Sequence, residues 1–187
     1  QQGLLVVTPN YRLIPSATPT NTLEDAAAAV AWVFAHIQEY GGDPGRISLS
    51  GHSAGAYLST LITLDRSWLA AYQINANRIA GLIPFSSQMG PHTSFRQNPG
   101  AAALESYAPL SHARADAPPI LLLIGDRDKD LPDRHPKNTD MLARLEQAGH
   151  KDCRLVELPS TDHVSMQSAG IPLLVAQIKR LQATPSP

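Results

Sequence analysis

The feature that most constrains this chain is a pentapeptide, Gly51-His52-Ser53-Ala54-Gly55, between a short strand (46–50) and a helix (56–62). A G-x-S-x-G pattern in this context is typical of a sharp turn that lifts a serine hydroxyl out of the end of a sheet. Ser53 is therefore the candidate nucleophile. The backbone N–H of Ala54 lies at a helix N-terminus, where it can donate to an oxyanion. We expect a side chain at either glycine of the pentapeptide to crowd the turn.

Composition limits the classes of protein that this chain can belong to. With 43% hydrophobic and 17% charged residues, its 187 residues suit one globular domain. The net charge of −1 gives no reason to expect nucleic acid or an anionic membrane as a partner. There is no apolar run of 18 or more residues, so no transmembrane helix is expected. The single cysteine excludes an intramolecular disulfide and a cysteine-based zinc cluster.

Apolar strands alternate with amphipathic helices along the chain. This alternation predicts the α/β class, with a mostly parallel sheet and helices on both faces. We expect five strands, at 4–8, 46–50, 78–85, 119–125 and 153–158. We expect helices at 22–40, 56–62, 136–148 and 171–181.

A serine hydroxyl needs a general base, and that base needs a carboxylate to orient it. In parallel sheets such groups gather beyond the carboxyl ends of strands. His163 follows the strand expected at 153–158, on a loop before the last helix, so it is the candidate base. The other histidines are expected to be structural or on the surface: His36, His52, His92, His112, His135 and His150.

Several carboxylates compete for the role of orienting acid. Asp126 and Asp128 both lie just beyond the strand expected at 119–125, and their spacing does not separate them. Asp130 and Asp162 are further candidates, but we interpret Asp130 as a solvated residue and Asp162 as a loop cap. The order serine, aspartate, histidine is the order found in α/β-hydrolases.

Several further segments, together with the pentapeptide, carry a resemblance to a known family. They are Asn10-Tyr11-Arg12-Leu13, Leu23-Glu24-Asp25-Ala26 and Asp43-Pro44-Gly45-Arg46-Ile47. With them the chain resembles the esterase and lipase branch of the α/β-hydrolase superfamily over essentially its whole length. It is similar to hormone-sensitive-lipase-like and feruloyl-esterase-like carboxylesterases, and its pentapeptide also resembles that of kynurenine-formamidase-like members. In such families the acid is usually the last residue of G-x-x-D, so the resemblance favours Asp128.

The resemblance also implies a His-Gly-Gly loop before the Asn10–Leu13 segment, whose N–H groups complete the oxyanion hole. The sequence has no such loop, and the strands that normally precede it are absent. We therefore expect residues 1–187 to be a partial α/β-hydrolase domain that lacks its N-terminal strands. Of the expected oxyanion donors, only the Ala54 N–H would remain. Localisation stays open, with the cytoplasm slightly favoured, because a targeting signal would lie upstream.

The expected function is hydrolysis of a small-molecule carboxylic ester through Ser53, His163 and Asp128, with an acyl-enzyme intermediate. This chemistry needs no metal or organic cofactor. The alternatives are an arylformamidase, another amidase or a peptidase of the same fold, or a catalytically impaired fragment. Candidate residues for the pocket wall, for which core packing is an equal alternative, are Phe85, Met89 and Phe95.

Overall fold

A four-stranded parallel sheet forms the centre of the molecule. The computed structural model describes residues 2–91 and 104–183. The strands lie in the order β1-β2-β3-β4, and every neighbouring pair is parallel. Their bounds are Ser48–His52 (β1), Gly81–Phe85 (β2), Ile120–Gly125 (β3) and Cys153–Leu158 (β4). The expected α/β class with a parallel sheet is confirmed.

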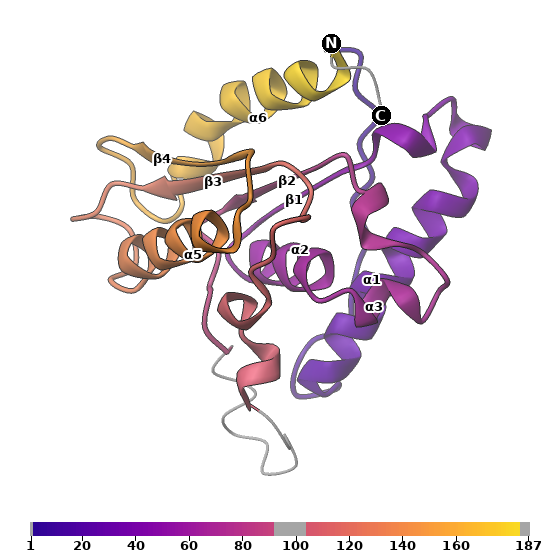
Figure 1. Cartoon of the computed structure of the whole chain (residues 1–187), viewed down its shortest axis with the longest axis horizontal. Helices are drawn as coiled ribbons and strands as arrows, with labels where there is room; N and C mark the ends of the chain where they lie inside the picture. The colour runs from indigo at the N-terminus through magenta and orange to yellow at the C-terminus, as the bar shows by residue number, and fades with distance from the viewer. Residues whose placement is uncertain (1, 92–103, 184–187) are drawn as a thin grey trace.

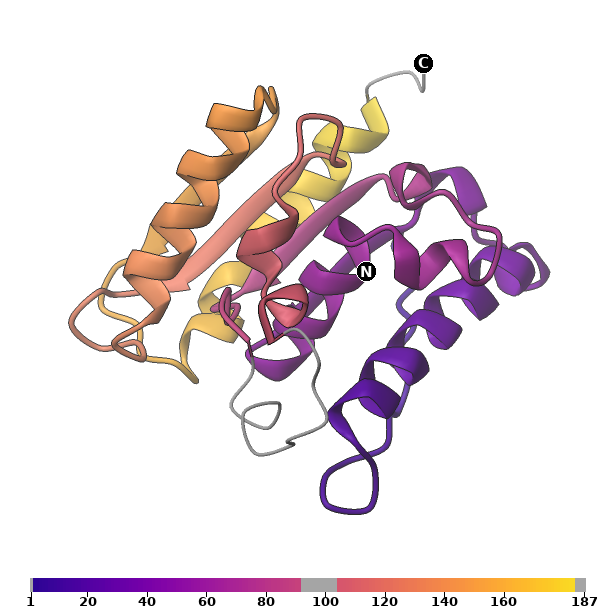
Figure 2. The same ribbon diagram turned by 60° about the horizontal axis from the view of Figure 1, so that its bottom comes forward.

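Helices cover both faces of this sheet. Figure 1 shows α6 on one face and α2 and α5 on the other, and Figure 2 shows α1 beyond α2. The helices are α1 (Pro19–His36), α2 (Ala54–Leu64), α3 (Ser67–Ala70), α5 (Arg134–Ala148) and α6 (Met166–Ala183). Short 3₁₀ helices span Ile37–Tyr40, Pro44–Arg46, Ala76–Arg78, Leu104–Tyr107 and Pro109–His112. In the described part of the chain, every helix is too short or too polar to cross a bilayer.

The core follows from the alternation of side chains along the strands, which points successive residues to opposite faces. One cluster joins the sheet to α2 and α5: Leu64, Leu82, Met89, Leu110, Ile120, Leu122, Met141 and Leu145. The cluster on the other face joins the sheet to α6: Ile83, Phe85, Leu121, Leu123, Leu158 and Met166. The inner strands β2 and β3 are thus buried on both faces, which explains their unbroken apolar sequences.

The prediction of a fifth strand at 4–8 is wrong. This segment has no strand assignment, and the described sheet has four strands. The side chains of Leu5, Val6 and Val7 are 53%, 76% and 41% exposed. Apolar β-branched residues favour extended backbone, but a strand also requires a hydrogen-bonded neighbour, and the pattern of one segment does not report whether it has one.

The parallel arrangement brings four polar residues to one end of the sheet. Ser53 directly follows β1, and Ser86 directly follows β2. Asp130 lies in the turn that follows β3, and His163 lies in the loop that follows β4. Because all four strands run in the same direction, these residues meet at a single edge.

Candidate active site

Ser53 occupies a strained turn between β1 and α2. Its φ of 52° and ψ of −111° lie in a region that residues with a side chain rarely adopt. The turn is held by the Ser53 N–H, which donates to the carbonyl of Phe85 at 2.9 Å, and by the Tyr57 N–H, which donates to the carbonyl of Ser53 at 2.9 Å. The Ser53 side chain does not cap the helix, so its hydroxyl is directed elsewhere. Ala54 is the first residue of α2, as expected.

The two glycines of the pentapeptide have different steric roles. A Cβ at Gly51 would lie 2.4 Å from the carbonyl carbon of Gly55 and 2.5 Å from its oxygen, closer than real contacts allow. A Cβ at Gly55 would meet no described atom within 4 Å outside its own helix backbone. The crowding expected at both positions therefore exists only at Gly51, where the strand passes the helix.

His163 lies beside Ser53, as expected for the candidate base. Its Nε2 is 3.0 Å from the Ser53 Oγ, and its Nδ1 is 2.8 Å from Oδ1 of Asp130. A carboxylate only accepts hydrogen bonds, so Nδ1 carries the ring proton. Nε2 of the neutral ring then has a free lone pair, and the Ser53 hydroxyl donates to it. This is the tautomer that a general base requires.

Asp130 is held as a buried carboxylate. Its side chain is 3% exposed and accepts from the N–H groups of Leu131 (2.7 Å) and Gly125 (3.0 Å) as well as from His163. Burial is the largest single influence and opposes ionisation, but the donors from Leu131, His163, Gly125 and Ser86 together outweigh it. The pKa of Asp130 therefore lies below its ordinary value, and the group is anionic near neutral pH.

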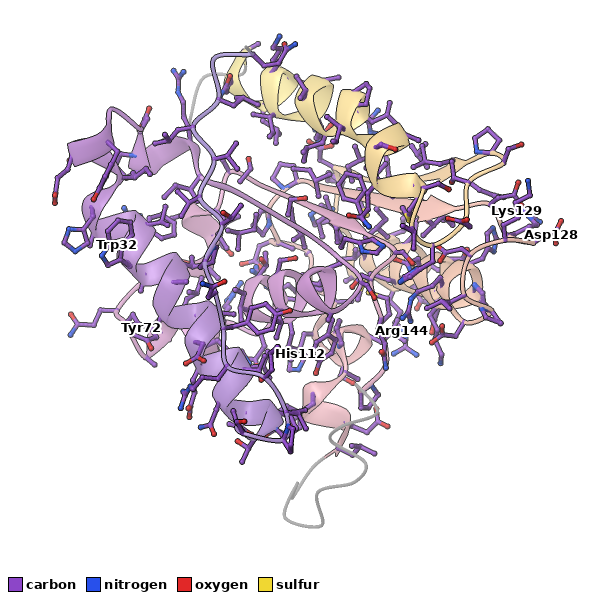
Figure 3. The ribbon with its side chains drawn as sticks, turned by 180° about the vertical axis from the view of Figure 1, so that it is seen from behind. Trp32, Tyr72, His112, Asp128, Lys129 and Arg144 are labelled. Carbon is purple, nitrogen blue, oxygen red and sulfur yellow. The ribbon has the colours of Figure 1, made fainter. Side chains whose placement is uncertain are left out.

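The expectation that Asp128 is the orienting acid is corrected by this geometry, because Asp130 occupies the position beside His163. The N–H of Asp130 donates to the carbonyl of Asp126 at 2.8 Å, which closes a turn and returns Asp130 to the end of the sheet. Asp128 lies at the tip of that turn, exposed, and Figure 3 shows it pointing away from the molecule beside Lys129. The interpretation of Asp130 as solvated is likewise wrong.

The other two acidic candidates fix loops. Asp126 accepts from the N–H of Ser160 at 2.8 Å and so ties the turn after β3 to the loop after β4. Oδ1 of Asp162 accepts from the N–H groups of Val164 (2.9 Å) and Ser165 (2.7 Å), which is the loop-capping geometry expected for it. Both carboxylates have a pKa below the ordinary value, chiefly because of these backbone donors.

Two polar residues beside the Ser53–His163–Asp130 chain were not expected from the sequence. The hydroxyl of Ser86 is 3.0 Å from both Oδ1 of Asp130 and Nδ1 of His163. Nε2 of His52 donates to the carbonyl oxygen of His163 at 2.7 Å, and the two imidazole rings lie 4.6 Å apart. One feature of the sequence could have identified Ser86 as a site residue, namely its position directly after an apolar strand. His163 was identified because it too follows a strand.

The residues expected to line a pocket pack in the core where they are described. Phe85 is 6% exposed and Met89 is fully buried, and they belong to the clusters that pack on opposite faces of the sheet. Phe95 and His92 lie outside the described residues. Within residues 2–91 and 104–183, no group of three or more His, Cys, Asp or Glu side chains is arranged to hold a metal ion.

Comparisons with known proteins show what this chain is similar to. A family model described as BD-FAE matches residues 1–77. The probable carboxylic ester hydrolase LipM of Mycobacterium tuberculosis is 32% identical over 182 residues, which cover 86% of this chain and 42% of the relative. A probable isoprenylcysteine alpha-carbonyl methylesterase, ICMEL1 of Arabidopsis thaliana, is 28% identical over 174 residues, or 78% of this chain and 36% of the relative. The chain thus spans less than half the length of these curated relatives.

Solved structures show the same fold at lower sequence identity. A truncated carbohydrate esterase from gut microbiota matches with a TM-score of 0.76 and 15% identity, covering 94% of this chain and 73% of that one. A structure titled bacterial heroin esterase matches with a TM-score of 0.73 and 22% identity, covering 93% and 63%. At these identities the likeness concerns the fold alone.

Proposed function

We propose that this chain, as a member of the esterase and lipase branch of the α/β-hydrolase superfamily, hydrolyses carboxylic esters through Ser53, His163 and Asp130. The observation that carries the proposal is the unbroken hydrogen-bonded chain from the Ser53 Oγ to His163 (3.0 Å) and from His163 to Asp130 (2.8 Å). Three groups in this order meet the geometric requirement for an activated nucleophile, its base and an orienting carboxylate.

In the proposed reaction the Ser53 Oγ attacks the acyl carbon while its proton passes to Nε2 of His163. The resulting imidazolium protonates the leaving alcohol as the acyl–oxygen bond breaks, which leaves an acyl-enzyme on Ser53. His163 then takes a proton from water as the water oxygen attacks the acyl carbon, and the imidazolium returns that proton to the Ser53 Oγ as the bond between Ser53 and the acyl group breaks and the carboxylic acid leaves. Asp130 remains ionised throughout, fixes the ring tautomer and stabilises the imidazolium.

The start of α2 supplies a donor for the charge that develops on the substrate. The first N–H groups of a helix have no acceptor within the helix, and they lie at the positive end of its dipole. The N–H of Ala54 is the first of these groups and belongs to the residue next to the nucleophile. We therefore assign it the stabilisation of the tetrahedral oxyanion. Removing one such donor typically lowers turnover about 100- to 1,000-fold.

The names of the relatives favour an ester over an amide as substrate. LipM is named as a carboxylic ester hydrolase, and the plant relative is named as a methylesterase. Both names describe the cleavage of a carboxylic ester, and the shared chemistry of the proposed triad suits that bond. We therefore propose a small-molecule ester as the substrate class.

The test pairs covalent labelling with turnover. The purified protein is treated with a fluorophosphonate, and the modified peptide is mapped by mass spectrometry, with Ser53→Ala as the matched control. We expect one adduct on Ser53, none in the variant, and hydrolysis of p-nitrophenyl acetate that the substitution abolishes. Faster cleavage of N-formylkynurenine or a peptide anilide than of the ester would reassign the substrate class. Labelling that persists in Ser53→Ala would overturn the proposed nucleophile.

A further inference from the structure

We propose that Ser86 is a positioning residue for the reaction proposed above, on which this inference rests. Its hydroxyl holds the carboxylate of Asp130 and the imidazole of His163 in one fixed arrangement. Ser86 lies at the carboxyl end of β2, between the strands that carry the nucleophile and the acid. Ser53, Ser86, Asp130 and His163 thus each follow a different strand of the sheet.

The three side chains form a closed triangle of contacts. The Ser86 Oγ is 3.0 Å from Oδ1 of Asp130 and 3.0 Å from Nδ1 of His163, and those two atoms are 2.8 Å apart. Because the carboxylate only accepts, the Ser86 hydroxyl proton points to Asp130. The Ser86 oxygen lies beside the proton on Nδ1. Rotation of either the carboxylate or the ring would therefore break a contact with Ser86.

The backbone at Ser86 indicates that its side chain matters. Its φ of 47° is a conformation that strains a residue with a Cβ and that glycine adopts freely. The residue is fully buried, and its N–H donates to the carbonyl of Leu123 at 2.7 Å, which holds the backbone in place. What serine adds over glycine at this position is the hydroxyl, and the described partners of that hydroxyl are Asp130 and His163.

A hydrogen-bond donor to the carboxylate that orients the base should affect the chemical step of the proposed reaction. Hydrogen bonds to charged groups are stronger than neutral ones, and a buried charge that loses one donor must reorient or accept a poorer partner. Loss of the Ser86 hydroxyl would loosen Asp130 and, through it, the ring that must reach the Ser53 Oγ. We expect kcat to fall while KM stays nearly unchanged.

The experiment compares two variants that lack the hydroxyl but differ in backbone strain. Ser86→Ala keeps the strained Cβ, whereas Ser86→Gly relieves the strain. Ser87→Ala is the matched control, because Ser87 is also fully buried but its hydroxyl lies 3.3 Å from that of Thr60. With p-nitrophenyl acetate we expect kcat to fall at least about tenfold in both Ser86 variants, with KM within about twofold. Ser87→Ala should retain nearly full turnover.

A double-substitution cycle separates positioning from a general structural effect. If Ser86 acts through Asp130, then Ser86→Ala should change kcat less than about threefold in an Asp130→Asn background. An equal loss in both backgrounds, or full turnover in Ser86→Ala or Ser86→Gly, would overturn the role of Ser86. Absence of ester hydrolysis in the unsubstituted protein would instead overturn the proposed function, so the two failures are distinguishable.

Discussion

Nε2 of His52 lies 2.7 Å from the carbonyl oxygen of His163, so the residue before the proposed nucleophile donates a hydrogen bond to the backbone of the proposed base. His52 is the last residue of β1, whereas His163 lies in the loop after β4, at the opposite edge of the described sheet. The contact therefore ties the turn that carries Ser53 directly to the loop that must present the imidazole to it.

We expect turnover to depend on this donor. His52→Phe keeps a ring that can pack against His163 but removes the N–H, whereas His52→Gln keeps an amide donor. A partly buried hydrogen bond of this kind contributes about 1 kcal/mol, so kcat should fall about fivefold in His52→Phe and less in His52→Gln. The measurement is steady-state hydrolysis of p-nitrophenyl acetate by the three proteins. Equal activity in His52→Phe and the unsubstituted protein would show that the contact does not position His163.

The same residue predicts a pH dependence of stability. Burial, the largest influence, lowers the pKa of His52 below its ordinary value near 6.5. The unfolded chain then binds a proton at His52 more readily than the folded chain does, so folding free energy is lost as the pH falls below about 6.5. Denaturant midpoints measured between pH 8 and pH 5 should fall more steeply for the unsubstituted protein than for His52→Gln. Parallel curves would contradict this prediction.

The glycines of the pentapeptide provide a matched pair for stability. Gly51→Ala places a Cβ against the backbone of Gly55, which cannot move without shifting α2, so we expect a loss of about 3 kcal/mol or failure to fold. Gly55→Ala adds a methyl group to open space in the first turn of a helix, where alanine is preferred over glycine by up to about 1 kcal/mol. Thermal unfolding of both variants checks the ranking. A less stable Gly55→Ala than Gly51→Ala would refute the steric account.

The sequence pattern predicted the parallel sheet, and it predicted that His163 lies beside Ser53. An apolar run bounded by turn residues indicates a strand directly from the sequence. The strand β4 accordingly begins and ends where it was expected, at Cys153 and Leu158. His163 was found because the ends of parallel strands converge. The segment at 4–8 was misjudged because pairing depends on a neighbour that lies elsewhere in the chain.

The carboxylate that lies beside His163 was misidentified for a different physical reason. Asp126, Asp128 and Asp130 occupy every second position of a five-residue segment. Only the path of the backbone through the turn decides which of them lies at the end of the sheet. That path is set by the hydrogen bond from the N–H of Asp130 to the carbonyl of Asp126 and by the lack of a side chain at Gly125. A Cβ at Gly125 would lie 3.0 Å from the Cβ of Asp130, so the close approach depends on glycine. None of this is visible in residue spacing.

The central claim is that Asp130, and not Asp128, orients the base. The most direct measurement compares kcat for ester hydrolysis in Asp130→Asn and Asp128→Asn, with circular dichroism to confirm that both variants fold. Asparagine at position 130 removes the charge that selects the ring tautomer of His163, so we expect a loss of about 10³- to 10⁴-fold. Asp128 is exposed at the tip of its turn, so its variant should stay within about twofold of the unsubstituted protein. The reverse ranking, or equal losses, would contradict the account.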